Sequence, residues 1–186
     1  MLDRSNFFVI SGGPGAGKTT LIEMLARRGF ATVAEAGRDI LRLQAAIGGT
    51  AVHGKDSAAY CELMLMRGIT DYEREAENDE PVFFDRGIGE LVGYCRLVGL
   101  PVPAHVRRAG EIYRYSETVF LAPPWREIYR QYDLRRQDWA EAVRTFELIR
   151  DAYQEAGYRT VELPLASVSQ RAAFVLGQID QALLDG

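Results

Sequence analysis

The sequence has few cysteines and no long apolar run, and each scarcity excludes a class of protein. The two cysteines, Cys61 and Cys95, lie within apolar patterns and lack the spacing of metal ligands. We therefore expect two buried thiols in a reducing compartment rather than a disulfide framework. No apolar run approaches the roughly 18 residues of a membrane span, and the first residues carry neither a secretory nor a myristoylation signal. We expect a cytoplasmic protein without a membrane partner.

Positive charge is not in excess either. Asp and Glu number 26 against 22 Lys and Arg, and the net charge is −4. Such a balance provides no global field to attract nucleic acid, so any basic site must be local and no nucleic-acid partner is expected.

Asparagine is also scarce, because Asn6 and Asn78 are the only two. Neither begins an N-K-x-D motif, so selectivity for GTP lacks its usual support.

What the sequence does contain is a glycine-rich motif, GGPGAGKT, directly after the apolar run 7–10. It fits G-x-x-x-x-G-K-[ST] between a strand and an amphipathic helix, the context that the motif requires. Glycines let backbone N–H groups converge on a polyphosphate, and the following helix points its positive end at the anion. Lys18 is predicted to reach the β- and γ-phosphates, and the Thr19 hydroxyl to bind Mg²⁺. The predicted nucleotide-binding set is Gly12, Gly13, Pro14, Gly15, Ala16, Gly17, Lys18, Thr19 and Thr20.

Strand-like runs alternate with helical stretches along the chain. This alternation predicts a parallel sheet, and 186 residues with 47% hydrophobic composition predict one α/β domain over 1–186. Ligands of such sheets lie at the carboxyl ends of the strands. The predicted strands are 7–10, 32–34, 82–84, 118–121 and 160–163. The predicted helices are 18–28, 38–46, 57–78, 90–97, 104–115, 125–157 with a break, and 169–184.

Two carboxylates follow predicted strands. Asp85, after the third strand, is the expected acidic partner of the Mg²⁺ water shell opposite Thr19; its alternative is a helix N-cap. Glu35, after the second strand, is predicted to accept a proton from a substrate hydroxyl as the γ-phosphoryl group departs. Its alternative is a surface carboxylate paired with Arg38.

Residues 125–139 concentrate four arginines in an acidic chain. Arg126 and Arg130 are four residues apart, a repulsive spacing on a helix that an anion between them and the phosphate site would relieve. We therefore predict a phosphate-covering lid over 124–145, with Arg126 on the nucleotide and Arg130 or Arg135 in catalysis. The alternative is an exposed, solvated helix. Ala166, in the loop that leaves the last strand, is placed beside the nucleotide base by position alone.

These segments together resemble a known family. The glycine-rich motif, the stretch EAGRD after the second strand, the stretch VFFDRG after the third, and YRTVELP near the end are similar to small predicted P-loop ATPases. That family includes the ribosylnicotinamide-kinase domain of bifunctional NAD-pathway regulators. The resemblance covers nearly the whole chain and implies a nucleoside/nucleotide-kinase fold. Such a fold is a three-layer P-loop sandwich with a parallel five-stranded sheet in the order 2-3-1-4-5 and a helical lid.

The resemblance also implies roles for single residues. Deoxynucleoside kinases carry a glutamate after the second strand as the proposed base and a D-R pair after the third, and Glu35 and Asp85-Arg86 match these positions. The predicted substrate residues are Glu35, Arg38, Asp39 and Arg86. Aromatic and apolar residues of the 57–78 helix either line an acceptor pocket or belong to the core.

Three functions remain open at this point. A small-molecule kinase that uses ATP and Mg²⁺ explains the motif, both carboxylates and the arginines together. A nucleotide-hydrolysing or nucleotide-sensing switch explains the motif and Asp85 alone. A partner protein that binds ATP without turnover is the third. The sequence does not identify the acceptor.

Overall fold

The computed structural model describes residues 2–129 and 138–184. Its strands are β1 (Leu2–Asp3), β2 (Phe7–Gly12), β3 (Ala31–Val33), β4 (Val82–Asp85), β5 (Tyr113–Arg114), β6 (Thr118–Ala122) and β7 (Arg159–Glu162). Its helices are α1 (Lys18–Arg27), α2 (Ala36–Ile47), α3 (Ser57–Arg74), the short 3₁₀ helix η1 (Ile88–Glu90), α4 (Leu91–Leu97), α5 (Ala104–Ile112), α6 (Trp139–Glu155) and α7 (Val168–Leu184).

The main sheet has five strands in the order β3-β4-β2-β6-β7, and every neighbouring pair is parallel. In the order of these five strands along the chain this is 2-3-1-4-5, so the predicted architecture is confirmed. Val9 of the central strand pairs with Phe84 on one side and Val119 on the other. The carboxyl ends of the strands therefore meet at one edge, where ligands of such sheets bind.

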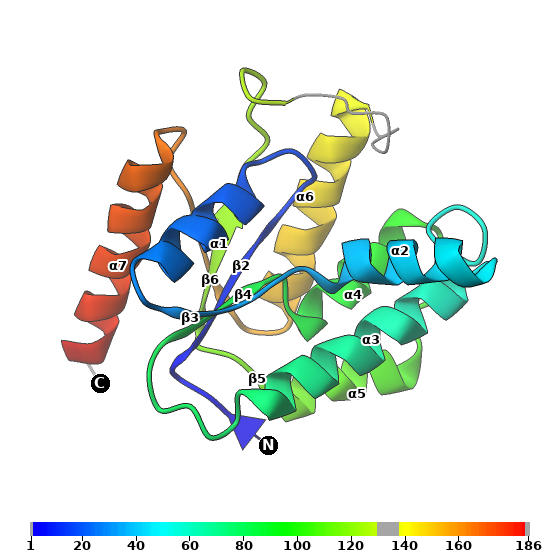
Figure 1. The fold of residues 1–186 in the computed structure, drawn as a ribbon, viewed down its shortest axis with the longest axis horizontal. Helices are drawn as coiled ribbons and strands as arrows, with labels where there is room; N and C mark the ends of the chain where they lie inside the picture. Colours follow the sequence, from blue (N-terminus) through cyan, green and yellow to red (C-terminus); the bar gives the residue numbers. More distant parts are fainter. Residues whose placement is uncertain (1, 130–137, 185–186) are drawn as a thin grey trace.

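Two hydrophobic cores cover the two faces of the sheet, and β2 contributes to both. Phe7 and Val9 belong to the core under α3, α4, α5 and α6, whereas Phe8 and Ile10 belong to the core under α1 and α7. Successive side chains of a strand point to opposite faces, so an apolar run without alternation is what a doubly covered strand requires. Figure 1 shows the two helical layers on either side of the sheet, with α2 packed on α3 at the edge of the domain.

The segment after β6 differs from its predicted helix. Residues 125–129 form a single turn, in which the Trp125 carbonyl accepts hydrogen bonds from the N–H groups of Ile128 and Tyr129. The helix begins only at Trp139, because the side chain of Asp138 accepts a hydrogen bond from the Glu141 N–H over 2.8 Å and caps its N-terminus. The prediction of a helix from residue 125 is therefore wrong for this first stretch.

Two other helices end earlier than predicted. α3 stops at Arg74, and the Asn78 side chain instead accepts the N–H of Glu80 in the turn before β4. α5 stops at Ile112, because Tyr113 and Arg114 pair with β1 in a small separate sheet.

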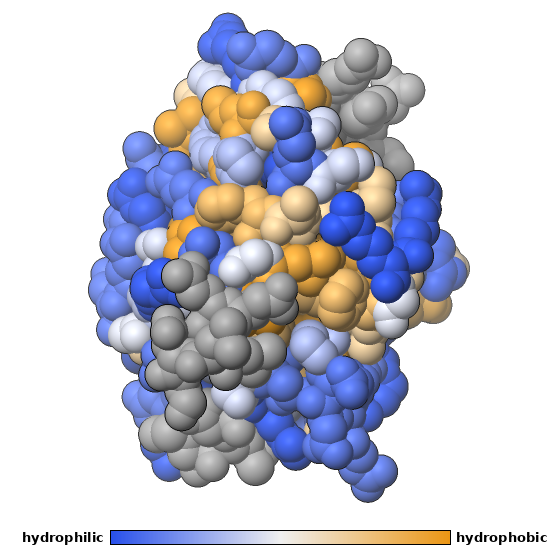
Figure 2. All heavy atoms as spheres, turned by 90° about the vertical axis from the view of Figure 1, so that its left-hand side faces the viewer, coloured by the Kyte–Doolittle hydropathy of each residue, from blue (hydrophilic) through white to orange (hydrophobic). Residues whose placement is uncertain are grey.

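No helix in the described part of the chain is both long and apolar enough to span a membrane. Figure 2, seen from the side of α7, shows apolar side chains exposed between hydrophilic areas.

Candidate phosphoryl-transfer site

The glycine-rich loop connects β2 directly to α1. Gly12 ends the strand with a φ of 128°, and Gly17 precedes the helix with a φ of 78°. Residues that carry a Cβ rarely adopt these backbone conformations. A Cβ on Gly12 would also collide with the Ala122 carbonyl of the neighbouring strand. The loop therefore requires glycine at both ends, and its backbone leads into the positive N-terminus of α1, a favourable place for an anion.

Lys18 lies buried inside this loop, with 6% of its surface exposed. Its Nζ donates hydrogen bonds to the carbonyl oxygens of Gly12 and Gly13, over 3.0 and 2.8 Å. Burial, aided by the positive charge of Arg86, lowers the pKa of Lys18 to about 8. The ammonium group is thus held at the loop in an environment that favours the approach of negative charge.

Thr19 and Asp85 face each other across the edge of the sheet. Ile10 pairs with Asp85 in the register of β2 and β4, and the Thr19 hydroxyl donates to Asp85 Oδ2 over 3.4 Å. The second carboxylate oxygen, Oδ1, is buried and has no hydrogen-bond partner among the described residues. Burial raises the pKa of Asp85. These features fit a magnesium ion, which takes a hydroxyl and one carboxylate and completes its shell with water and phosphate oxygens.

No group of three or more metal-ligating His, Cys, Asp or Glu residues occurs in the ranges that the structure describes. A magnesium–nucleotide site takes only one or two ligands from the protein. Thr19 and Asp85 would hold such an ion beside the loop.

Arg86 connects the glycine-rich loop to two carboxylates, those of Glu35 and Glu90. It is the one non-glycine residue of the described chain with a positive φ, 80°, and strained backbone of this kind concentrates at functional sites. Its Nε donates to Glu35 Oε1 over 2.9 Å, and its Nη1 donates to Glu90 Oε1 over 2.7 Å. Nη1 also lies 3.4 Å from the Gly12 carbonyl oxygen. We call Glu35, Arg86 and Glu90 the carboxylate–arginine cluster.

The charge of Arg86 controls Glu35. The guanidinium, more than any other group, lowers the pKa of Glu35 to about 2, and Lys18 contributes in the same direction. Glu35 is therefore ionised at neutral pH, and its ion-pair partner is Arg86 rather than Arg38. Glu90, which the sequence reasoning missed, is buried and also accepts a short hydrogen bond from the Ser11 hydroxyl. Its spacing of four residues from Arg86 is the signal that was available.

A pocket opens beside the cluster, between α3 and the ends of β3 and β4. Asp85, Arg86 and Glu90 contribute polar surface to it, and most of the remaining wall is apolar. Met64 of α3 lines this pocket. The chief apolar lining residues are Val33, Met64, Phe84, Ile88, Leu91 and Tyr115.

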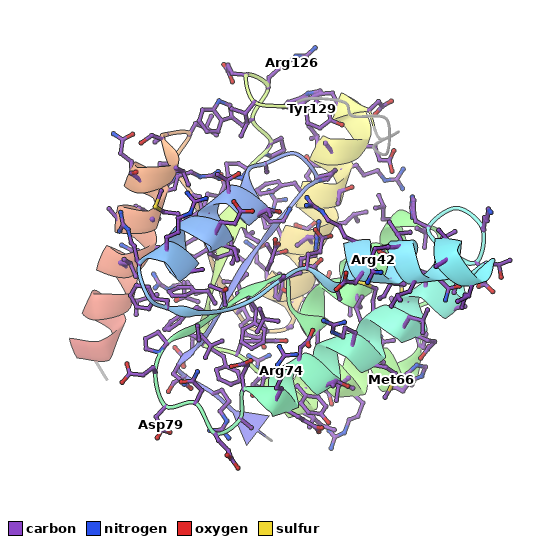
Figure 3. The ribbon with its side chains drawn as sticks, viewed as in Figure 1. Arg42, Met66, Arg74, Asp79, Arg126 and Tyr129 are labelled. Carbon is purple, nitrogen blue, oxygen red and sulfur yellow. The ribbon has the colours of Figure 1, made fainter. Side chains whose placement is uncertain are left out.

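Other predicted residues form no hydrogen bond or ion pair with the carboxylate–arginine cluster among the described residues. Arg38 and Asp39 are exposed on α2, and Asp39 lies 3.6 Å from Arg42. Arg126 is exposed at the outer end of the loop after β6, with its guanidinium 5.1 Å from the centre of the Trp139 ring (Figure 3). Ala166 is half-buried in the loop after β7. Arg130 and Arg135 lie outside the described residues.

The structure adds one residue at the loop that no sequence motif indicates. Arg171, in the first turn of α7, is buried and donates to the Ala16 carbonyl from 155 residues away in the chain. It lies inside the helix predicted over 169–184, but none of the sequence arguments about the site included it.

Comparisons with known proteins place this geometry in context. A model of an AAA-domain family, AAA_28, matches residues 7–171. No curated protein matches the chain significantly. Among solved structures, thymidylate kinase from Ehrlichia chaffeensis has a TM-score of 0.66 at 14% identity, with 93% of this chain and 97% of that chain covered. Deoxyadenosine kinase from M. mycoides has a TM-score of 0.67 at 11% identity, with 94% and 99% covered.

A third similar structure is NadR in complex with NR, with a TM-score of 0.64 at 20% identity. The alignment covers 87% of this chain but only 44% of that one, so this chain corresponds to less than half of that protein. At these identities the likeness establishes the fold, that of P-loop kinases.

Proposed function

The chain belongs to the AAA_28 family of AAA domains, and from that premise we propose that it is a small-molecule kinase. It transfers the γ-phosphoryl group of ATP to a hydroxyl or phosphate group of a nucleoside-like or other small metabolite. The observation that carries this proposal is the position of Arg86, which touches the phosphate loop at Gly12, lines the neighbouring pocket together with Glu90, and holds Glu35 beside it. A hydrolase or switch has no need of a charged cluster facing a second pocket.

Each residue of the site has a role in this reaction. Lys18 and the backbone N–H groups of the loop bind the β- and γ-phosphates and oppose the charge that spreads over the phosphoryl oxygens. A magnesium ion at Thr19 and Asp85 would neutralise further phosphate charge. Glu35 accepts a hydrogen bond from the acceptor hydroxyl and orients it toward the phosphoryl group.

The low pKa of Glu35 bears on when the proton moves. A carboxylate that Arg86 keeps ionised is a weak base toward a free hydroxyl. The hydroxyl becomes far more acidic as its oxygen bonds to phosphorus, so we place proton transfer to Glu35 late in the reaction. Arg86 then acts as the group that keeps Glu35 ionised and correctly placed.

The structural neighbours support the acceptor class. Thymidylate kinase and deoxyadenosine kinase carry a nucleotide and a nucleoside in their names, and the NadR structure contains NR. The pocket combines a mostly apolar wall with a polar cluster, and its chemistry matches an acceptor whose ring packs against Phe84 and Met64. Glu35 does not line the pocket itself but is held beside it by the lining residue Arg86, where it is available to the acceptor hydroxyl.

The test is an acceptor screen. The protein is incubated with ATP and Mg²⁺ and with nucleosides, nucleotides or pyridine ribosides in turn; ADP release is followed, and the phosphorylated product is identified by mass spectrometry. We expect at least one acceptor to accelerate ADP release and to gain one phosphoryl group, and Lys18→Ala to abolish both. ADP release that no acceptor changes would instead favour the nucleotide-hydrolysing alternative.

A further inference from the structure

Arg171 enters the phosphate-loop region through a well-defined helix start. The Ser167 N–H donates to the Gln170 side chain over 3.1 Å, and the Gln170 N–H lies 3.4 Å from the Ser167 hydroxyl, a reciprocal pair typical of a helix N-terminus. The Arg171 N–H then bonds the Ser167 carbonyl over 2.9 Å in the first turn of α7. This start lies at the same end of the molecule as the start of α1 (Figure 1), and it fixes the direction in which the Arg171 side chain leaves the helix.

The guanidinium of Arg171 lies directly against the phosphate loop. Nη1 donates to the Ala16 carbonyl oxygen over 2.8 Å, and a Cβ on Gly17 would lie only 2.9 Å from the same nitrogen. The centre of the guanidinium is 5.9 Å from the Trp125 ring, which belongs to the loop after β6. The side chain thus fills the space between the N-terminus of α1 and the loop after β6.

The hydrogen-bond donors of Arg171 are incompletely used. Only 2% of the residue is exposed, and Nε and Nη2 are buried without a partner among the described residues. None of the ion pairs found within these residues includes Arg171, whereas Arg86 is paired with two carboxylates. Within the described residues this buried guanidinium has lost its hydration for one hydrogen bond and a ring contact, with no counter-charge, and burial accordingly lowers its pKa. Such a group is suited to an anion that arrives from outside.

We propose that Arg171 is a nucleotide-binding residue whose free Nε and Nη2 bind a phosphate oxygen of the nucleotide held by the glycine-rich loop. The inference rests on the ATP site of the proposed function. A phosphate supplies both the acceptor atoms and the negative charge that the site lacks, and a guanidinium presents two parallel donors to it. A neutral base edge satisfies the donors but leaves the buried charge uncompensated, so the observations favour phosphate over base.

The test compares Arg171→Met with wild-type protein, using ATP and inorganic tripolyphosphate as probes in titration calorimetry. We expect affinity for both to fall roughly 10- to 100-fold, the loss of hydrogen bonds to a charged group. Arg171→Lys keeps the charge but not the planar pair of donors, so an intermediate loss is expected. Arg27→Met is the matched control, because Arg27 lies at the far end of α1 with its side chain 73% exposed; it should leave both affinities unchanged.

A second readout separates binding from folding. Because Arg171 is buried and has no counter-charge in the ranges 2–129 and 138–184, Arg171→Met should melt at the same temperature as wild type, or higher, without nucleotide, yet gain less from added ATP. A lower melting temperature without nucleotide would give Arg171 a structural role and overturn the proposal.

The probes also separate the possible failures. Weaker ATP binding with unchanged tripolyphosphate binding would show a contact with the base or ribose, against our assignment, and unchanged binding of both would remove Arg171 from the site. Wild-type protein that binds neither probe would overturn the ATP site and this inference together. Normal binding without any phosphorylated product would count against the kinase function while leaving the role of Arg171 standing.

Discussion

Arg86 donates its Nε hydrogen to Glu35 Oε1 over 2.9 Å, although 51 residues separate the two in sequence. The two residues follow neighbouring parallel strands, β4 and β3, so the sheet itself brings them together. The same guanidinium reaches Glu90 and the carbonyl of Gly12. A single side chain therefore joins the pocket to the phosphate loop, and the predictions that follow depend on this connection.

Replacing Glu35 should separate binding from chemistry. Glu35→Gln removes the carboxylate but keeps the shape, so ATP affinity is expected to stay within a few-fold while phosphoryl transfer falls roughly 10²-fold or more, the scale of a lost general base. A fluorescent ATP analogue reports affinity, and mass spectrometry reports product. Glu62→Gln, an exposed carboxylate on α3, is the control. Transfer that survives in Glu35→Gln would reduce Glu35 to a positioning or surface residue.

The ion pair also predicts how stability depends on pH. The folded pKa of Glu35, about 2, lies below its ordinary value of 4.5, so its contribution is fully present above pH 4.5 and is lost as the pH falls toward 2. Urea unfolding at pH 7 and pH 3 should therefore show a larger fall in unfolding free energy for wild type than for Glu35→Gln. Asp85, whose pKa is raised, titrates in the opposite sense but is present in both proteins. Equal falls would mean that the pair adds no stability.

Lys18 should take up a proton when ATP binds under alkaline conditions. Its pKa of about 8 leaves it mostly neutral at pH 9, and nearby phosphates raise that pKa because they stabilise the ammonium form. Calorimetric titrations at pH 9 in two buffers of different ionisation enthalpy should reveal close to one proton taken up, and almost none at pH 6.5.

A variant completes the Lys18 experiment. Lys18→Ala should lose most ATP affinity, because Lys18 is the one cation within the glycine-rich motif and the rest of that loop offers neutral backbone groups. If a folded Lys18→Ala protein binds ATP normally, the loop is not a phosphate cradle.

Asp85→Asn should weaken binding of Mg·ATP more than binding of metal-free ATP, since the lost charge acts on the metal. Affinities measured with Mg²⁺ and with EDTA give the comparison. Equal losses in the two conditions would assign Asp85 a purely structural role. The unpartnered Oδ1 makes the metal role the stronger expectation, because magnesium supplies the partner that this oxygen lacks.

For the arginines after β6 we predict an effect on the turnover number. We expect one of Arg130 and Arg135 to lower kcat on the order of 10²-fold when changed to Ala, with a smaller effect on ATP affinity, because a lid engages fully only when both substrates are bound. Arg126, Arg130, Arg135 and Arg136 are changed one at a time, and kcat and ATP affinity are measured for each. Near-normal turnover in all four variants would make this segment a solvated surface.

Sequence reasoning reached the parts of the site whose signal is local. The strands were visible because both faces of the sheet are covered and their apolar runs are unbroken, and Asp85 was found because it directly follows such a run. The helix predicted from residue 125 failed in its first stretch, where residues 125–129 form a single turn; the like charges of Arg126 and Arg130 at this spacing oppose a helix rather than favour one. The cap at Asp138 sets the actual start.

The missed residues depend on packing between distant segments. The spacing of Glu90 from Arg86 is local, but its second partner, Ser11 of β2, is 79 residues away, and only the packing of the sheet brings that hydroxyl to the carboxylate. Arg171 reaches Ala16 from the last helix without any motif around it. Contacts of this kind are set by the packing of layers, which periodicity and spacing do not encode.

The central strand has a consequence for how this protein can change. β2 supplies side chains to both cores and runs straight into the glycine-rich loop, so a substitution that shifts β2 in either core also shifts the start of that loop. Substitutions in β2 that keep the position of the glycine-rich loop are therefore few. α2, by contrast, buries only Gly37 and Ile40 and exposes Leu41, Leu43 and Ile47. Substitutions at these three exposed positions leave both cores, and therefore the strand that leads into the glycine-rich loop, unchanged.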